Sequence, residues 1–133
     1  MEIVENKALL VETTEPNLIT DSIKKSAVVS TNGSKYKVLV RWGLEEAQTL
    51  AMLEHKDIPS PILRDYTWTG KLTPFEHQKT TSSFLTLYDR AFCFNEQGTG
   101  KTASVIWAAD YLIKRNEIKR VLVLCPLSIM KSA

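Results

Sequence analysis

The chain has 133 residues, enough for one domain or for one domain with a small appendage. Its apolar fraction of 44% and its charged fraction of 24% are ordinary for a soluble globular protein. A net charge of +2 is too small to indicate a nucleic-acid partner by itself, so composition leaves the partner open.

Residues 1–58 are predicted to form a small α+β unit with the element order β-α-β-β-α. Thr14, followed by Pro16, indicates a helix start. Thr31–Ser34 is a hairpin turn signal between two valine-rich runs. The predicted elements are a strand over residues 7–13, a helix over 17–26, strands over 27–30 and 36–42, and a helix over 44–53.

Residues 59–70 contain two prolines and a glycine without clear periodicity, and they are interpreted as a linker. Residues 71–133 then begin a second unit. Its first helix is predicted to have Thr73 as N-cap and Glu76 as the partner in a capping box. This helix should continue to about Arg90, with an apolar side formed by Phe84, Leu85, Leu87 and Tyr88.

A βαβ pattern follows this helix. Ala91–Phe94 and Val121–Cys125 read as short buried strands, and the apolar segment Lys101–Arg115 between them reads as a helix that covers a parallel sheet. Cys93 and Cys125 lie inside these apolar runs, so we expect small buried hydrophobic residues, with a disulfide or a metal site as the alternatives. Two such strands would leave an open sheet edge that a protein partner could cover.

The loop Asn95–Thr102, with the sequence NEQGTGKT, joins the first predicted strand to the helix. Glycines allow backbone N–H groups to converge on a phosphate, and a helix start adds unpaired N–H groups and a positive dipole end. Lys101 would reach the β- and γ-phosphates of ATP, and the Thr102 hydroxyl would ligate Mg²⁺. The pattern G-x-x-x-x-G-K-[ST] has Asn95 in place of its first glycine, and the alternative is a strand-to-helix turn without a ligand. The predicted nucleotide-binding residues of the loop are Glu96, Gln97, Gly98, Thr99, Gly100, Lys101 and Thr102.

Two further segments carry candidate binding residues. Gln78 can donate and accept hydrogen bonds at once, which matches the edge of adenine, although a solvated helix surface is the alternative. After the second predicted strand, Ser128 and Lys131 lie at a fresh helix start that could hold a nucleic-acid phosphate, with an ordinary strand-to-helix turn as the alternative.

Together these segments resemble the opening motifs of superfamily 2 helicases of the Swi/Snf-like branch. TPFEHQ (Thr73–Gln78) is similar to the adenine-reading glutamine motif and NEQGTGKT to motif I, in which that branch commonly replaces the first glycine. VLVLCPLSIMKSA (Val121–Ala133) is similar to motif Ia. The sequences of these segments most resemble those of helicases encoded by bacteriophages. Residues 1–58 are weakly similar to a small β/α module that precedes the motor in some annealing helicases.

The resemblance implies an incomplete RecA-like α/β motor lobe that binds ATP and Mg²⁺, with DNA as the partner of the full protein. It implies that Lys101 and Thr102 are catalytic and that Gln78 contacts adenine. An aromatic residue often stacks on the adenine in such enzymes, and the candidates here are Tyr66, Trp68 and Phe75, with core packing or linker anchoring as the alternative for each. The chain contains no D-E-x-[HD] string, so we expect a truncated protein or a shortened gene product with little or no hydrolysis by itself.

Two other function classes remain alternatives. One is a short interaction or regulatory module derived from a helicase and lacking ATPase activity, and the other is a different P-loop enzyme such as a small kinase. No apolar run reaches the ~18–20 residues of a membrane span, and the N-terminus lacks signal-peptide features. We therefore expect a cytoplasmic protein, in the host cytoplasm if a phage encodes it, with no membrane partner.

Overall fold

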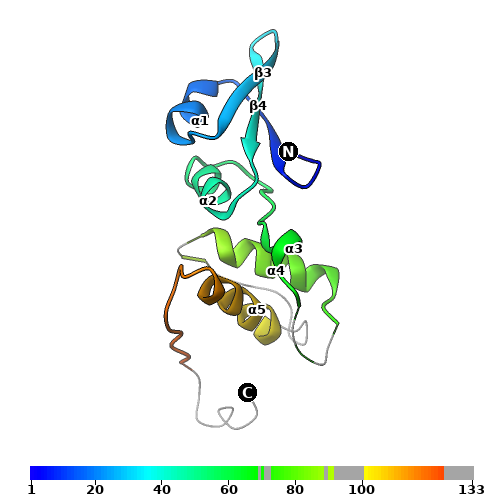
Figure 1. Cartoon of the computed structure of the whole chain (residues 1–133), viewed down its shortest axis with the longest axis vertical. Helices are drawn as coiled ribbons and strands as arrows, with labels where there is room; N and C mark the ends of the chain where they lie inside the picture. The colour runs from blue at the N-terminus through cyan, green and yellow to red at the C-terminus, as the bar shows by residue number, and fades with distance from the viewer. Residues whose placement is uncertain (69, 71–72, 89, 92–100, 125–133) are drawn as a thin grey trace.

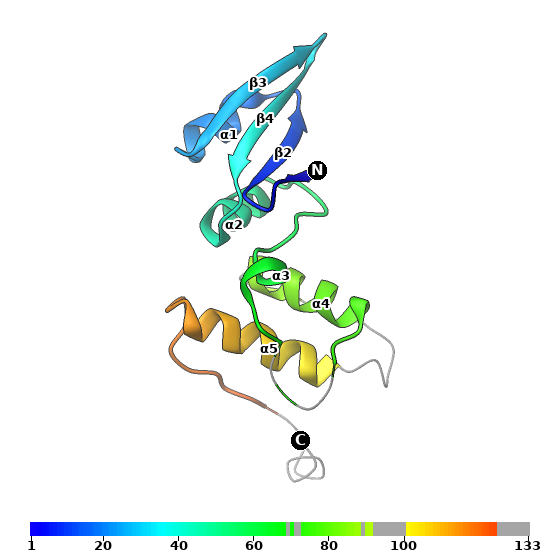
Figure 2. The same cartoon turned by 45° about the vertical axis from the view of Figure 1, so that its right-hand side comes forward.

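The structure is a computed structural model of the whole chain. It describes residues 1–133 except residues 69, 71–72, 89, 92–100 and 125–133 (Figure 1). In this described part a sheet lies at one end of the molecule and a group of helices at the other, in both Figure 1 and Figure 2.

The N-terminal half forms one four-stranded sheet in which every neighbouring pair is antiparallel. The strand order is β1-β2-β4-β3, so the two edges are β1 and β3. The strands are β1 (Glu2–Val4), β2 (Ala8–Thr13), β3 (Ser26–Asn32) and β4 (Lys35–Arg41). The predictions of a strand at 7–13 and of a hairpin around Thr31–Ser34 are confirmed.

The first strand, β1, was not predicted. It reaches β2 through a turn in which Glu5 and Asn6 have positive φ angles of 52° and 56°. Glycine is the usual residue in that region of backbone space, so this turn gives no strong signal in the sequence. The hairpin between β3 and β4 does carry the usual signal, because Gly33 has a φ of +65°.

Two helices pack with the sheet into one core. They are α1 (Pro16–Ser22) and α2 (Leu44–Met52). Leu9 and Val40 are register partners on one face of the sheet, and both are fully buried with Ile19 of α1 and Leu50 of α2. Strand residues two apart point to the same face, which is why an alternating pattern buries one side. The predicted α2 is confirmed, whereas α1 has Glu15 as its N-cap and ends four residues earlier than predicted.

The C-terminal half of the described chain is helical, with α3 (Ile62–Asp65), α4 (Glu76–Leu87) and α5 (Lys101–Lys114). The helix expected over Lys101–Arg115 is confirmed. The predicted capping box is wrong in position, because α4 has Phe75 as its N-cap and begins at Glu76. Gln78 closes the start of α4 instead, since its Oε1 accepts a hydrogen bond from the Phe75 N–H at 2.9 Å.

The predicted RecA-like parallel sheet is contradicted. The fold is α+β, and within the described residues the one sheet is antiparallel and accompanied by five helices. Val121–Leu124 and Ala91 have no strand structure, while residues 92–94 and Cys125 lie outside the described residues. An apolar run becomes a strand only when a neighbouring backbone pairs with it, and periodicity alone does not reveal such a neighbour. The prediction that these two strands form a parallel sheet with an open edge is therefore wrong as well.

The segment interpreted as a linker, residues 59–70, contains α3 and several buried side chains. Its Arg64 contacts the sheet end of the molecule: Nη1 donates to the carbonyls of Asn6 at 2.7 Å and of Trp42 at 3.0 Å. The guanidinium also lies 5.0 Å from the centre of the Trp42 ring. The Trp42 indole N–H in turn donates to the Pro59 carbonyl at 2.8 Å. These contacts join the two halves.

Among the residues that the structure describes, no helix combines the length and the apolar character needed to cross a lipid bilayer.

Candidate nucleotide site

Lys101 and Thr102 form the start of α5, a helix of 14 residues. Lys101 is partly buried and Thr102 is exposed. At a helix start the first backbone N–H groups lack intrahelical partners, so this position suits an anion. The other loop residues predicted to bind nucleotide, Asn95 and residues 96–100, lie outside the described residues, as do Ser128 and Lys131.

Gln78 lies in the first turn of α4 and is 7% exposed. Because its Oε1 accepts from Phe75, the carboxamide has a fixed direction at the start of the helix. A carbonyl oxygen can accept a second hydrogen bond, so helix capping and contact with a base are compatible. The alternative of a solvated surface glutamine does not fit this burial.

The helices that carry Gln78 and Lys101 pack against each other. The Ser82 hydroxyl of α4 donates to the Ser104 carbonyl of α5 at 2.8 Å, and the two residues are 0% and 1% exposed. The structure therefore places the predicted base-reading helix beside the predicted phosphate-binding helix. Sequence reasoning missed Ser82, since a serine inside a helix gives no signal of its partner.

The buried face of α4 differs from the predicted one. Phe84, expected on the apolar side, is 43% exposed, whereas Leu87 is buried as expected. Hydroxyl side chains occupy much of the buried face. The Thr86 hydroxyl donates to Ser60 Oγ at 2.6 Å, and the Ser60 N–H donates to Ser83 Oγ at 2.9 Å. These bonds satisfy polar groups that would otherwise destabilise a buried position.

The three aromatic candidates for base stacking occupy different environments. Tyr66 and Trp68 belong to an edge-to-face cluster with α5: their ring centres are 5.2 Å apart, and Trp68 lies 5.4 Å from Trp107. Tyr66 is only 8% exposed, so its ring is committed to packing. Phe75 is 68% exposed and stacks on His77 with ring centres 5.7 Å apart. Of the three, Phe75 presents the most accessible ring.

A polar contact strengthens the junction between residue 66 and α5. The Tyr66 hydroxyl donates to Asp110 Oδ2 at 2.6 Å, and Lys114 Nζ lies 3.1 Å from the same oxygen. The hydrogen bond from Tyr66, aided by Lys114, lowers the pKa of the Asp110 carboxyl. A carboxylate held ionised in this way orients neighbours and is a poor acid or base at neutral pH. We assign it a structural role.

Residues that could hold a divalent cation are few in the described chain. Within these residues there is no group of three or more His, Cys, Asp and Glu side chains able to hold a metal ion. Thr102 is exposed at the start of α5, so its hydroxyl can join a cation that also contacts a nucleotide phosphate. The side chains therefore fit a metal that arrives with the nucleotide.

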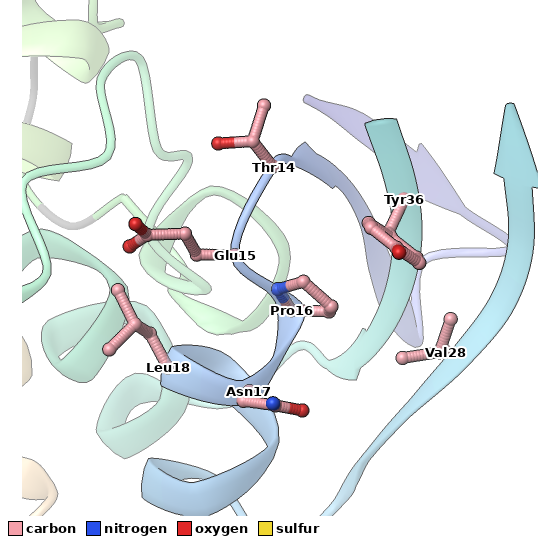
Figure 3. A pocket seen from close by; sticks show the side chains of 7 residues that line it. All are labelled: Thr14, Glu15, Pro16, Asn17, Leu18, Val28 and Tyr36. Carbon is pink, nitrogen blue, oxygen red and sulfur yellow. The ribbon is translucent and has the colours of Figure 1, made fainter. Parts of the chain in front are cut away.

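A separate hollow of about 720 Å³ lies at the sheet end of the molecule. Figure 3 shows Pro16 and Asn17 at the start of α1 opposite Tyr36 of β4 and Val28 of β3. Its lining includes the Glu15 carboxylate and no lysine, arginine or histidine. A triphosphate needs positive charge or converging N–H donors, so this hollow does not suit ATP.

Known proteins add no further guide to the site. No family model, curated protein or solved structure matches the chain significantly.

Proposed function

We propose that this chain is the N-terminal part of an ATP-dependent DNA helicase or translocase, and that it contributes the binding surface for ATP and Mg²⁺. The supporting observation is the position of Lys101 and Thr102 in the first turn of α5, directly after the glycine-bearing loop. The lysine ammonium would balance phosphate charge and the threonine hydroxyl would join the Mg²⁺ shell.

Gln78 supplies the base contact in this proposal. Its helix packs on α5, and its carboxamide is held by the Phe75 N–H. A carboxamide of fixed direction presents a donor and an acceptor that match the N6–H donor and the N7 acceptor of adenine, whereas the same edge of guanine carries two acceptors, O6 and N7. The site would therefore prefer ATP over GTP.

Contact with DNA is proposed for the region after α5. Lys119 and Arg120 are exposed there, and Arg115 lies 5.7 Å from the centre of the Tyr111 ring. Such side chains suit the sequence-independent contacts that proteins make with the phosphate backbone. Ser128 and Lys131 continue the same proposed surface along the sequence.

Calorimetric titration of this chain with Mg·ATP tests the proposal. Wild type should bind, although weakly, and Lys101→Ala should weaken binding at least about tenfold because a charge-assisted phosphate contact is lost. Lys24→Ala, which removes an exposed lysine at the sheet end of the molecule, is the matched control and should bind ATP like wild type.

A second experiment measures ATP hydrolysis by the longest natural protein that contains this chain. DNA should stimulate its ATP hydrolysis, and Lys101→Ala should abolish the stimulation. Equal hydrolysis rates for wild type and Lys101→Ala would rule out the enzymatic proposal.

An interaction module without ATPase activity is the second candidate. It is favoured by apolar side chains that face water: Val105, Ile106 and Ile113 of α5 are 45%, 57% and 41% exposed, and Leu122 and Leu124 are 84% and 86% exposed. Exposed apolar surface of this kind is typical of a site that another protein covers. Absence of ATP binding by wild type would leave this candidate as the better one.

A further inference from the structure

The contact between Ser82 and Ser104 connects α4 and α5 at a defined position along the two helix axes. Both residues are almost completely buried, at 0% and 1% exposed, and the hydroxyl-to-carbonyl distance is 2.8 Å. A polar group buried without a partner destabilises a protein by about 1–3 kcal/mol. The Ser82 hydroxyl therefore favours the one helix alignment in which it reaches the Ser104 carbonyl.

This contact lies about one helical turn from each predicted ligand-binding side chain. Ser82 follows Gln78 by four residues in α4, and Ser104 follows Lys101 by three residues in α5. Residues three or four apart share a helix face. A shift of one helix along the other would therefore displace Gln78 relative to Lys101 by the same amount.

The buried face of α4 is mainly polar, and Leu87 is the one large apolar residue among the buried residues described for this helix. Large interdigitating side chains normally fix how two helices pack. Here the buried residues of α4 include Ser82, Ser83 and Thr86, which are small and offer little to interlock. The Ser83 and Thr86 hydroxyls bond to Ser60, on a different segment. Ser82 is the hydroxyl of this group that is bonded to α5.

We infer that Ser82 is a positioning residue that sets base selectivity, by holding the helix of Gln78 in register with the helix of Lys101. The inference rests on the proposed nucleotide site. The phosphates contact the start of α5 and the adenine edge contacts the start of α4, so both contacts form together only when the helices are aligned. Loss of the alignment should weaken adenine recognition and leave phosphate binding unchanged.

The experiment compares the dissociation constants of Mg·ATP and Mg·GTP for the full chain. Wild type should prefer ATP. Ser82→Ala should weaken ATP binding by about threefold to tenfold, the worth of one hydrogen bond, and leave GTP binding unchanged. The affinity of Ser82→Cys for ATP should lie between those of wild type and Ser82→Ala, because a thiol is a weak donor.

Ser83→Ala is the matched control, because it makes the same chemical change one residue away. It removes the acceptor of the Ser60 N–H and should lower the melting temperature. Its preference for ATP over GTP should equal that of wild type, which separates positioning from general destabilisation.

The outcomes distinguish the two proposals. If wild type binds neither nucleotide, the proposed function fails. If wild type binds both equally, the phosphate contacts stand, and both the base contact of Gln78 and the role of Ser82 are overturned. If Ser82→Ala keeps the full preference for ATP, the nucleotide site stands and the role of Ser82 is overturned. An equal loss of preference in Ser82→Ala and Ser83→Ala would also overturn it.

Discussion

The buried faces at the two ends of this molecule differ in their chemistry. In the sheet unit, formed by β1–β4, α1 and α2, apolar residues such as Val11 and Val38 lie inside at 2% and 0% exposed. In the helical region, formed by α3–α5 and the residues up to Leu124, the buried face of α4 carries hydroxyl groups. Large apolar residues such as Ile106 and Leu122 face water there.

Both ends nevertheless contribute to one hydrophobic core, in which Ile62 and Trp107 of the helical region cluster with Leu50 of the sheet unit. The sheet unit buries one face of its strands with α1 and α2. The helical region also buries hydrogen-bonded hydroxyl groups, and it leaves apolar side chains of α5 exposed. A surface of that type is usually covered by a further layer, and we propose that the larger helicase supplies it.

The largest expected effect tests how much core packing in the sheet unit contributes to stability. Leu50 of α2 is fully buried in the core, so Leu50→Ala should lower the free energy of unfolding by about 2–5 kcal/mol. Leu63→Ala, at a position that is 40% exposed, should have a much smaller effect. Urea unfolding followed by circular dichroism measures both. Similar losses for the two variants would show that the burial of Leu50 in this core adds no stability.

A smaller effect is expected where the two ends meet. Arg64→Ala removes the hydrogen bonds to Asn6 and Trp42 and should lower the free energy of unfolding by about 1–2 kcal/mol, since the side chain is partly exposed. Amide exchange should then quicken in the sheet unit next to the contact.

Arg41→Ala is the control for this change, because its ion pair with Glu46 lies within the sheet unit and the Arg41 side chain is 57% exposed. Its effect on stability should be at most about 1 kcal/mol. If Arg41→Ala destabilised the protein as much as Arg64→Ala, the contacts of Arg64 would not couple the two ends.

The smallest effect concerns the junction of Tyr66 and α5 and depends on pH. The pKa of Asp110 is lowered from its ordinary value of 3.8 by the Tyr66 hydroxyl, so the ionised carboxylate stabilises the folded state above that value. This contribution is lost as the pH falls below 3.8 toward the folded-state pKa. Asp110→Asn should therefore be less stable than wild type at pH 7, and the difference should shrink in urea titrations below pH 3.8. A difference that stays constant across this range would refute the assignment.

Local patterns in the sequence predicted the sheet unit well because several of its elements carry a clear local signal. Strand β2 alternates between the core and the other face, and Gly33 provides the positive φ that the hairpin turn requires. The exceptions follow from weak local signals, as at Glu5 and Asn6, where no glycine marks the turn before β2. In the helical region the prediction of α5 is confirmed, whereas the predicted strand at Val121–Leu124 is wrong and most of the strand predicted at 91–94 lies outside the described residues.

For the candidate site, the sequence by itself determined which functional groups are available: a lysine and a threonine after a glycine-bearing loop, and a glutamine upstream. Tertiary structure decided which helix faces are inside, that Gln78 caps its own helix, and that Ser82 connects α4 to α5. The physical reason is the distance along the sequence between the residues that determine each feature. Helix starts and hairpin turns depend on neighbours within about four residues, whereas burial and strand pairing depend on partners such as Ser104 that lie far along the chain.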